Sequence, residues 1–155
     1  MRRVLALAGL LLSLGGGCSR KAPNATPEGA VRELVIALRQ VDGDPSRAKV
    51  AFELLAKETQ DNLVTRAERY GAASGKRIAP EQMIAPASFL EHFEARELKA
   101  TITGRYAVVR AAGLLDEERA EIPCVFEDGS WHVRIELPVL SPVEVRQRDD
   151  LPRPN

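Results

Sequence analysis

The sequence predicts an α+β fold in which helices come first and pack on an antiparallel meander of four strands. Apolar residues recur with the 3.6-residue period of a helix up to about residue 90, and with the two-residue period of a strand from Leu98 onward. An Asp128-Gly129 pair between two alternating runs is typical of a tight hairpin turn. Helices followed by an antiparallel meander belong to the α+β class.

Length and composition fit one soluble domain. The chain has 155 residues, of which 45% are hydrophobic, and its 22 basic and 22 acidic side chains give a net charge of zero. A nucleic-acid-binding protein would carry a basic excess, so we expect no nucleic-acid partner. Two distant cysteines exclude a disulfide-rich scaffold and a zinc site built from cysteines.

The first predicted helix begins after Thr26, which can cap it, with Pro27 at the first helical position and Glu28 in the first turn. One helical face then carries apolar residues at 31, 34, 35, 38 and 41. The Asp-Gly-Asp-Pro segment at 42–45 ends this helix.

Further helices are predicted before the sheet. Asp44 or Ser46 can cap a second helix whose inward residues include Leu54 and Leu55, and a third helix covers residues 58–73. Pro80 and Pro86 each begin a short helical turn, over residues 81–84 and 88–90.

The four predicted strands cover residues 98–103, 106–110, 120–126 and 131–137. Pro123 indicates that the third strand has an edge or a bulge there. The last strand alternates between an apolar face, at positions 131, 133, 135 and 137, and a polar face formed by His132, Arg134 and Glu136.

Residues 1–17 have the pattern of an export signal. A basic start, Met-Arg-Arg, precedes an apolar run over residues 4–14 and three glycines. This pattern is typical of a secretory signal peptide. The apolar run is shorter than the roughly 20 residues that a membrane-spanning helix needs.

Cys18 follows these small residues directly, and the segment resembles the bacterial lipoprotein signal. The resemblance implies diacylglycerol attachment at Cys18 and cleavage before it. The usual pattern has Leu three residues before the cysteine, where this chain has Gly15, with Leu14 one step further out. Ordinary signal-peptidase cleavage, with Cys18 incidental, is the alternative.

The lipoprotein resemblance implies a location and a domain plan. The mature chain would be held by lipid at a membrane of the cell envelope with its domain in the periplasm, and Ser19 favours the outer membrane under the enteric sorting rule. Residues 18–25 are predicted to be a flexible tether, residues 26–140 the folded domain and residues 141–155 a disordered tail rich in proline and charge.

The domain resembles small secreted bacterial members of the nuclear-transport-factor-two-like superfamily, which has the cone-shaped fold of ketosteroid isomerase. The resemblance is carried by the Thr-Pro opening helix at 26–38, the polar break at 42–44, the Leu-Leu ending at 54–55 and the Glu-Asp-Gly-Ser-Trp-His-Val run at 127–133. It implies a curved, cone-like sheet. In the enzymes of this fold the sheet and helices enclose a pocket, and whether this chain has such a pocket is left open. Relatives often form homodimers through the open sheet face, which suggests the same for this chain. The resemblance implies no activity, because unrelated functions share one fold.

No catalytic or metal-binding motif is present in the sequence, and we expect no cofactor and no metal. His92 and His132 are the only histidines, and both are interpreted as surface residues. The acidic Asp116-Glu117-Glu118 run is interpreted as a solvated loop, since it lacks the spaced ligands of a calcium loop. No motif gives Tyr70 or Tyr106 the role of a proton donor.

Cys124 and Trp131 are interpreted as core residues, because both lie in phase with apolar neighbours. A disulfide between Cys18 and Cys124 can form only if Cys18 is not lipidated.

Two functional hypotheses follow. The first is a membrane-tethered envelope lipoprotein whose domain has a non-catalytic binding or structural role, with an unidentified protein or small-molecule partner. The alternative is a small pocket enzyme of the isomerase or hydrolase type on the same fold.

Overall fold

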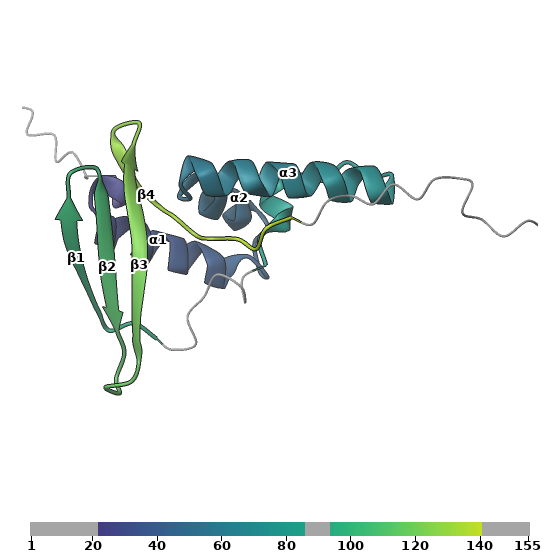
Figure 1. The fold of residues 1–155 in the computed structure, drawn as a ribbon. Coiled ribbons are helices and arrows are strands. Elements are labelled where there is room, and N and C mark those ends of the chain that lie inside the picture. The colour runs from purple at the N-terminus through teal and green to yellow at the C-terminus, as the bar shows by residue number, and fades with distance from the viewer. Residues whose placement is uncertain (1–21, 86–93, 141–155) are drawn as a thin grey trace, which may run out of the picture.

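The computed structural model describes residues 22–85 and 94–140, and it has the predicted α+β architecture. Three helices precede a four-stranded antiparallel sheet, and α1 lies across one face of that sheet while α2 and α3 extend away from it (Figure 1). The predicted signal peptide, Cys18, His92, the turn expected at 88–90 and the predicted tail lie outside the described residues.

Helix α1 (Pro27–Gln40) begins as its sequence predicts. The Gly29 backbone N–H donates to Thr26 Oγ1 at 3.1 Å, which satisfies one of the free N–H groups of the first turn. Its buried face consists of Pro27, Ala30, Val31, Leu34, Ala37 and Leu38. This face supplies the helical half of the core.

A short 3₁₀ helix, η1 (Pro23–Ala25), precedes α1, so the folded domain begins earlier than predicted. The composition of residues 22–25 predicts a flexible tether, whereas η1 contacts both α1 and β4. The close approach depends on Gly29, because a Cβ at that position would overlap the Pro23 carbonyl oxygen. The missing side chain therefore lets η1 fold back onto the first turn of α1.

Helix α2 (Ser46–Glu53) follows the predicted break. The Asp44 carboxylate accepts hydrogen bonds from the Ser46 hydroxyl at 2.7 Å and from the Ser46 backbone N–H at 3.0 Å. The hydroxyl bond is the main cause, followed by the backbone bond, of an Asp44 pKa below its ordinary value. The N-cap position is Pro45, which has no side-chain oxygen, and Ser46 is already the first helical residue, so the prediction that Asp44 or Ser46 caps this helix is wrong. Asp44 instead fixes the turn before the helix through its bonds to Ser46.

Helix α3 (Lys57–Ser74) ends at Gly75, whose φ of 66° is the left-handed conformation that favours glycine. It is the third helix that the sequence predicts. The predicted turn at Pro80 is the 3₁₀ helix η2 (Pro80–Met83), which contacts α2 and α3.

The sheet has the strand order β1-β2-β3-β4, and every neighbouring pair is antiparallel. Its strands are β1 (Glu97–Thr103), β2 (Tyr106–Ala112), β3 (Arg119–Glu127) and β4 (Ser130–Val133). Asp128 and Gly129 both have positive φ, at 49° and 83°, as a two-residue hairpin turn requires. The Glu28 carboxylate of α1 accepts the Ala100 N–H at 2.9 Å and so covers part of β1, the edge strand.

Strand β4 ends at Val133, four residues earlier than the sequence predicts. Pro123 of β3 explains the difference. The Arg134 N–H donates to the Pro123 carbonyl at 2.8 Å, but Pro123 has no N–H to donate to the Arg134 carbonyl in return. The prediction of an edge at Pro123 is therefore confirmed, and the predicted polar stripe on β4 is wrong beyond His132, because Arg134 and Glu136 follow the strand.

After Val133 the chain leaves the sheet and runs beside α3 (Figure 1). The Thr59 hydroxyl accepts the Ile135 N–H and donates to the Ile135 carbonyl, both at 3.0 Å. Arg66 of α3 donates to the Pro138 carbonyl further along. Side-chain hydrogen bonds from α3 thus replace the sheet ladder for this segment.

The core lies between the helices and the inner face of the sheet. Its fully buried members include Leu38, Leu55, Leu63, Val109 and Val133. Trp131 is buried in the same cluster, and its ring meets the Phe126 ring edge-on with centroids 5.3 Å apart. The interpretation of Trp131 as a core residue is confirmed.

We predict that Gly29→Ala destabilises the protein by about 2 kcal/mol, because the added methyl group must displace η1, even though Ala is the better helix former. Gly43→Ala is the matched control, since its Cβ would meet nothing closer than 3.9 Å. Chemical denaturation followed by circular dichroism measures both. Equal stability of the two variants would contradict the packing of η1 on α1.

We predict that Thr59→Val lowers the free energy of unfolding by about 2 kcal/mol, since it leaves both backbone groups of Ile135 without their partner. Thr65→Val on the same helix is the control, because the Thr65 hydroxyl is exposed and bonds only the Asp61 carbonyl of its own helix. Urea denaturation compares the two. A loss at Thr65 as large as that at Thr59 would show that the hydrogen bonds to Ile135 are not the cause.

Candidate functional site

Cys18, the predicted lipidation site, lies outside the described residues, so its modification stays a prediction. The described chain begins only four residues later, at Ala22. Its first element, η1, contacts β4 near the end of the sheet that carries the β1–β2 and β3–β4 turns. Figure 1 shows this start of the chain at the same end as those two turns.

An open hollow of about 490 Å³ lies at this turn end of the sheet. It is lined by Lys57, Arg105, Phe126, Glu127 and Asp128, which come from the start of α3 and from both turns. The β1–β2 turn is joined to the end of β3, because the Phe126 N–H donates to the Arg105 carbonyl at 2.8 Å. Two of the residues that line the hollow are therefore bonded to each other through the backbone.

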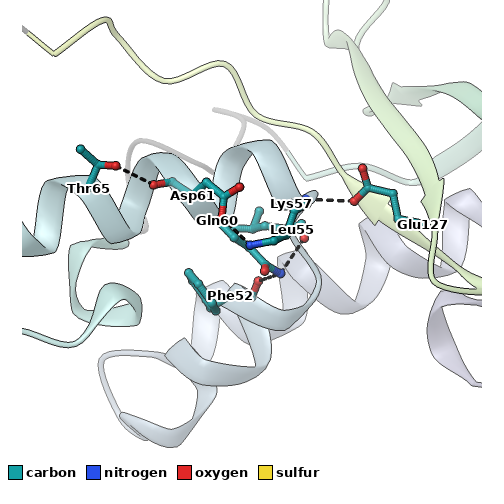
Figure 2. A network of polar contacts seen from close by, with 7 residues as sticks. All are labelled: Phe52, Leu55, Lys57, Gln60, Asp61, Thr65 and Glu127. Atoms are coloured by element: carbon teal, nitrogen blue, oxygen red, sulfur yellow. Dashed lines mark hydrogen bonds and ion pairs between the residues drawn. The ribbon is translucent and has the colours of Figure 1, made fainter.

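Glu127 joins the β3–β4 turn to α3 (Figure 2). Its Oε2 accepts the Lys57 backbone N–H at 3.0 Å, which uses the first free N–H of the helix. The Lys57 ammonium forms an ion pair with Asp61 one turn later. The Glu127 carboxylate thus occupies the N-terminus of α3.

Gln60 fixes the other side of this helix start (Figure 2). Its Nε2 donates to the Phe52 carbonyl at 3.0 Å and to the Leu55 carbonyl at 2.9 Å. These carbonyls belong to the last turn of α2 and the link after it, where the helix leaves acceptors free. One side chain therefore holds the α2–α3 connection in place beside β4.

The hollow combines opposite charges. Lys57 and Arg105 supply cations, and Glu127 and Asp128 supply carboxylates. The Arg105 guanidinium also lies 5.9 Å from the centre of the Tyr106 ring. This open, mixed-charge lining suits contact with a polar surface, and it shelters no single titratable group.

His132 is half-buried on the sheet face opposite the helices, and its place in the alternating pattern predicts a surface residue. Its Nε2 lies 2.9 Å from Ser130 Oγ. Its Nδ1 is buried and has no partner among residues 22–85 and 94–140. A hydroxyl–imidazole contact is the geometry of general-base activation, but the carboxylate that would orient the imidazole is missing from this part of the chain.

Cys124 is a buried free thiol, as predicted. Burial raises its pKa to about 12, and the nearby negative charge of Glu28 adds to the effect. A thiol reacts as the thiolate, so this environment makes Cys124 inert near neutral pH.

The remaining candidates are surface residues. Asp116, Glu117 and Glu118 lie in the β2–β3 loop, where Glu118 accepts the Leu114 and Leu115 N–H groups. This confirms the loop interpretation. Tyr70 and Tyr106 are 58% and 57% exposed. Within the described residues, no three His, Cys, Asp or Glu side chains are placed to hold a metal ion.

The alternating pattern does not reveal the apolar residues that are exposed at the turn end of the sheet. Ile102, Tyr106 and Phe126 are large and exposed, and each is the first or the second-last residue of its strand. The pattern places Ile102 and Phe126 on the inner face, yet both are exposed. Periodicity assigns a residue to a face of the sheet, and it does not say which positions of that face are covered.

No protein-family profile matches this chain, and comparison with curated proteins and with solved structures gives no significant match.

We predict that Cys124 in the folded Cys18→Ala variant, where it is the only thiol, reacts with a thiol reagent at pH 8 about a thousandfold more slowly than in urea. The factor follows from a thiol pKa of about 12 in the fold against 9.0 in its ordinary state. Below pH 9 the thiol is protonated in both states. Between pH 9 and 12 only the unfolded chain loses this proton, so this contribution to stability falls as pH rises.

Cys124→Ala is the control for the pH dependence. Its free energy of unfolding should fall less steeply above pH 9 than that of the parent, since the other titrating groups are shared. Parallel curves, or fast labelling of the folded protein, would contradict the burial of this thiol.

Proposed function

We propose that this protein is an envelope lipoprotein, tethered to a membrane by lipid at Cys18, whose domain has a non-catalytic binding or structural role. The proposal rests on one observation, the basic start, apolar run and small residues that lead directly to Cys18. Two or three acyl chains hold a protein at a membrane stably, so such an anchor needs no spanning segment.

The position of the folded domain supports this arrangement. Its first described element, η1, starts five residues after Cys18, and it packs on α1 and β4. None of the helices in the described part of the chain is long and apolar enough to cross a membrane. The proposed location is the periplasmic side of the envelope, with the outer membrane suggested by Ser19.

The burial pattern supports a non-catalytic domain. Thr59 is the one buried polar side chain among residues 22–85 and 94–140, and its hydroxyl is fully used by Ile135. A general acid or base works best in a sheltered site with a tuned pKa. The buried positions described here are otherwise occupied by apolar side chains that fill the core.

Membership of the nuclear-transport-factor-two-like superfamily is part of the proposal. Three helices followed by a four-stranded antiparallel meander agree with the resemblance that residues 26–137 carry. Such an assignment supplies no substrate, because the fold hosts unrelated functions.

The Ser130–His132 contact is the observation that favours the alternative, a small hydrolase or isomerase. The pair lacks an orienting partner at Nδ1 within the described chain, and the residue paired with His132 across the sheet, Val125, is apolar. The non-catalytic proposal therefore accounts for more of the structure.

We predict that Cys18→Ala moves the protein from the membrane fraction to the soluble periplasmic fraction and abolishes incorporation of labelled palmitate, because the lipid attachment atom is removed. Cys124→Ala is the matched control and should remain in the membrane and keep the label. Cell fractionation with immunodetection measures both. An unchanged membrane fraction for Cys18→Ala would refute the anchor.

A further inference from the structure

The turn end of the sheet carries three large apolar side chains that are exposed. Ile102 is 55% exposed, Tyr106 57% and Phe126 41%. They belong to β1, β2 and β3, and each is the first or the second-last residue of its strand, beside one of the two turns. We call these three residues the apolar rim.

Charged groups that suit an interface between water and lipid headgroups lie beside residues of the rim. Arg105 lies between Ile102 and Tyr106 in the chain and its guanidinium is near the Tyr106 ring. Lys57 and the carboxylates of Glu127 and Asp128 line the hollow beside Phe126. Tyrosine and other aromatic rings with a polar edge are enriched at the headgroup level of membranes, and cations favour anionic headgroups.

Chain length places this end near the proposed anchor. Ala22 is four residues from Cys18, so the two can be at most about 14 Å apart. Ala22 leads into η1, and η1 contacts β4, whose first residue follows the β3–β4 turn.

The opposite end of the sheet is separated from the turn end by the length of a strand. β2 runs from Tyr106 at the turn end to Ala112, and seven residues of strand span about 20 Å. The β2–β3 loop at that far end carries Leu114 and Leu115, which are also exposed. Exposure of apolar residues alone therefore does not distinguish the two ends, whereas the position of Ala22 does.

We propose that the apolar rim of Ile102, Tyr106 and Phe126 rests in the headgroup layer of the bilayer that holds the lipid anchor. This inference rests on the proposed lipidation of Cys18 and adds a fixed orientation of the domain. The turn end faces the membrane and the β2–β3 loop faces the aqueous space. Contact between the rim and the bilayer would restrict the rotation of a domain that only a few residues connect to its lipid anchor.

Tryptophan quenching in vesicles tests the orientation. The probe is the lipidated full-length protein in vesicles of phosphatidylcholine and phosphatidylglycerol with brominated acyl chains. The Tyr106→Trp variant has one indole more than the parent, and the fluorescence of this indole is the difference between the two proteins. We expect the brominated vesicles to quench most of that difference, compared with unbrominated vesicles. We also expect the added indole to emit at a shorter wavelength than an indole exposed to water. Ile102→Trp is a second rim variant. Leu114→Trp is the matched control at an exposed site, and we expect its added fluorescence to be unquenched.

The outcomes separate this inference from the lipid anchor. Quenching at both rim positions but not at 114 supports the proposal. Quenching at 114 alone, or at none of the three positions in protein that is lipidated and membrane-bound, overturns the orientation and leaves the anchor intact. If the indole of the Tyr106→Trp variant is shielded in native envelopes but not in vesicles, a protein partner covers the rim and the orientation is overturned. If the wild-type protein from cells carries no lipid and is found in the soluble fraction, both proposals are overturned.

Discussion

The backbone of Val133 is the point on which the arrangement of helices and sheet depends. Its N–H donates to the Leu54 carbonyl at 2.9 Å, and its carbonyl accepts the Ala56 N–H at 2.8 Å. The link between α2 and α3 is thereby added to β4 as a short parallel bridge. Because Leu55 and Val133 are both fully buried, this pairing occurs in the core and excludes water.

Two further features follow from that bridge. The start of α3 is brought beside the β3–β4 turn, where Glu127 can accept the Lys57 N–H and the hollow forms. The chain after β4 is brought beside α3, where the hydroxyl of Thr59 replaces a strand partner for Ile135. Gln60 then completes the junction by binding carbonyls of α2 and the link. The turn end of the molecule is consequently more rigid than a pair of surface turns would be alone.

This rigid end is also the end at which the chain enters the domain. A lipoprotein with a short tether has a restricted orientation, because the first residues of its domain must stay near the bilayer. The polar and aromatic character of the turn end fits that constraint, and the buried, inert Cys124 leaves Cys18 as the thiol available for modification. Location and architecture are thus linked in the proposed function, while the partner of the domain is identified by neither.

The sequence by itself determined the features that depend on neighbouring residues: the cap at Thr26, the break at Asp44, the left-handed hairpin turn at Gly129 and the burial of Cys124 and Trp131. Each follows from local backbone preference or from periodicity. Only the tertiary structure decided that β4 stops at Val133, that η1 packs over Gly29 and that Ser130 meets His132. These features depend on Pro123, on a missing Cβ and on side-chain conformation, whose effects reach residues distant in the chain or lie outside any periodic pattern. The exposure of Ile102 and Phe126 was likewise decided by the tertiary structure, because periodicity places both on the inner face and does not say which positions of that face are covered.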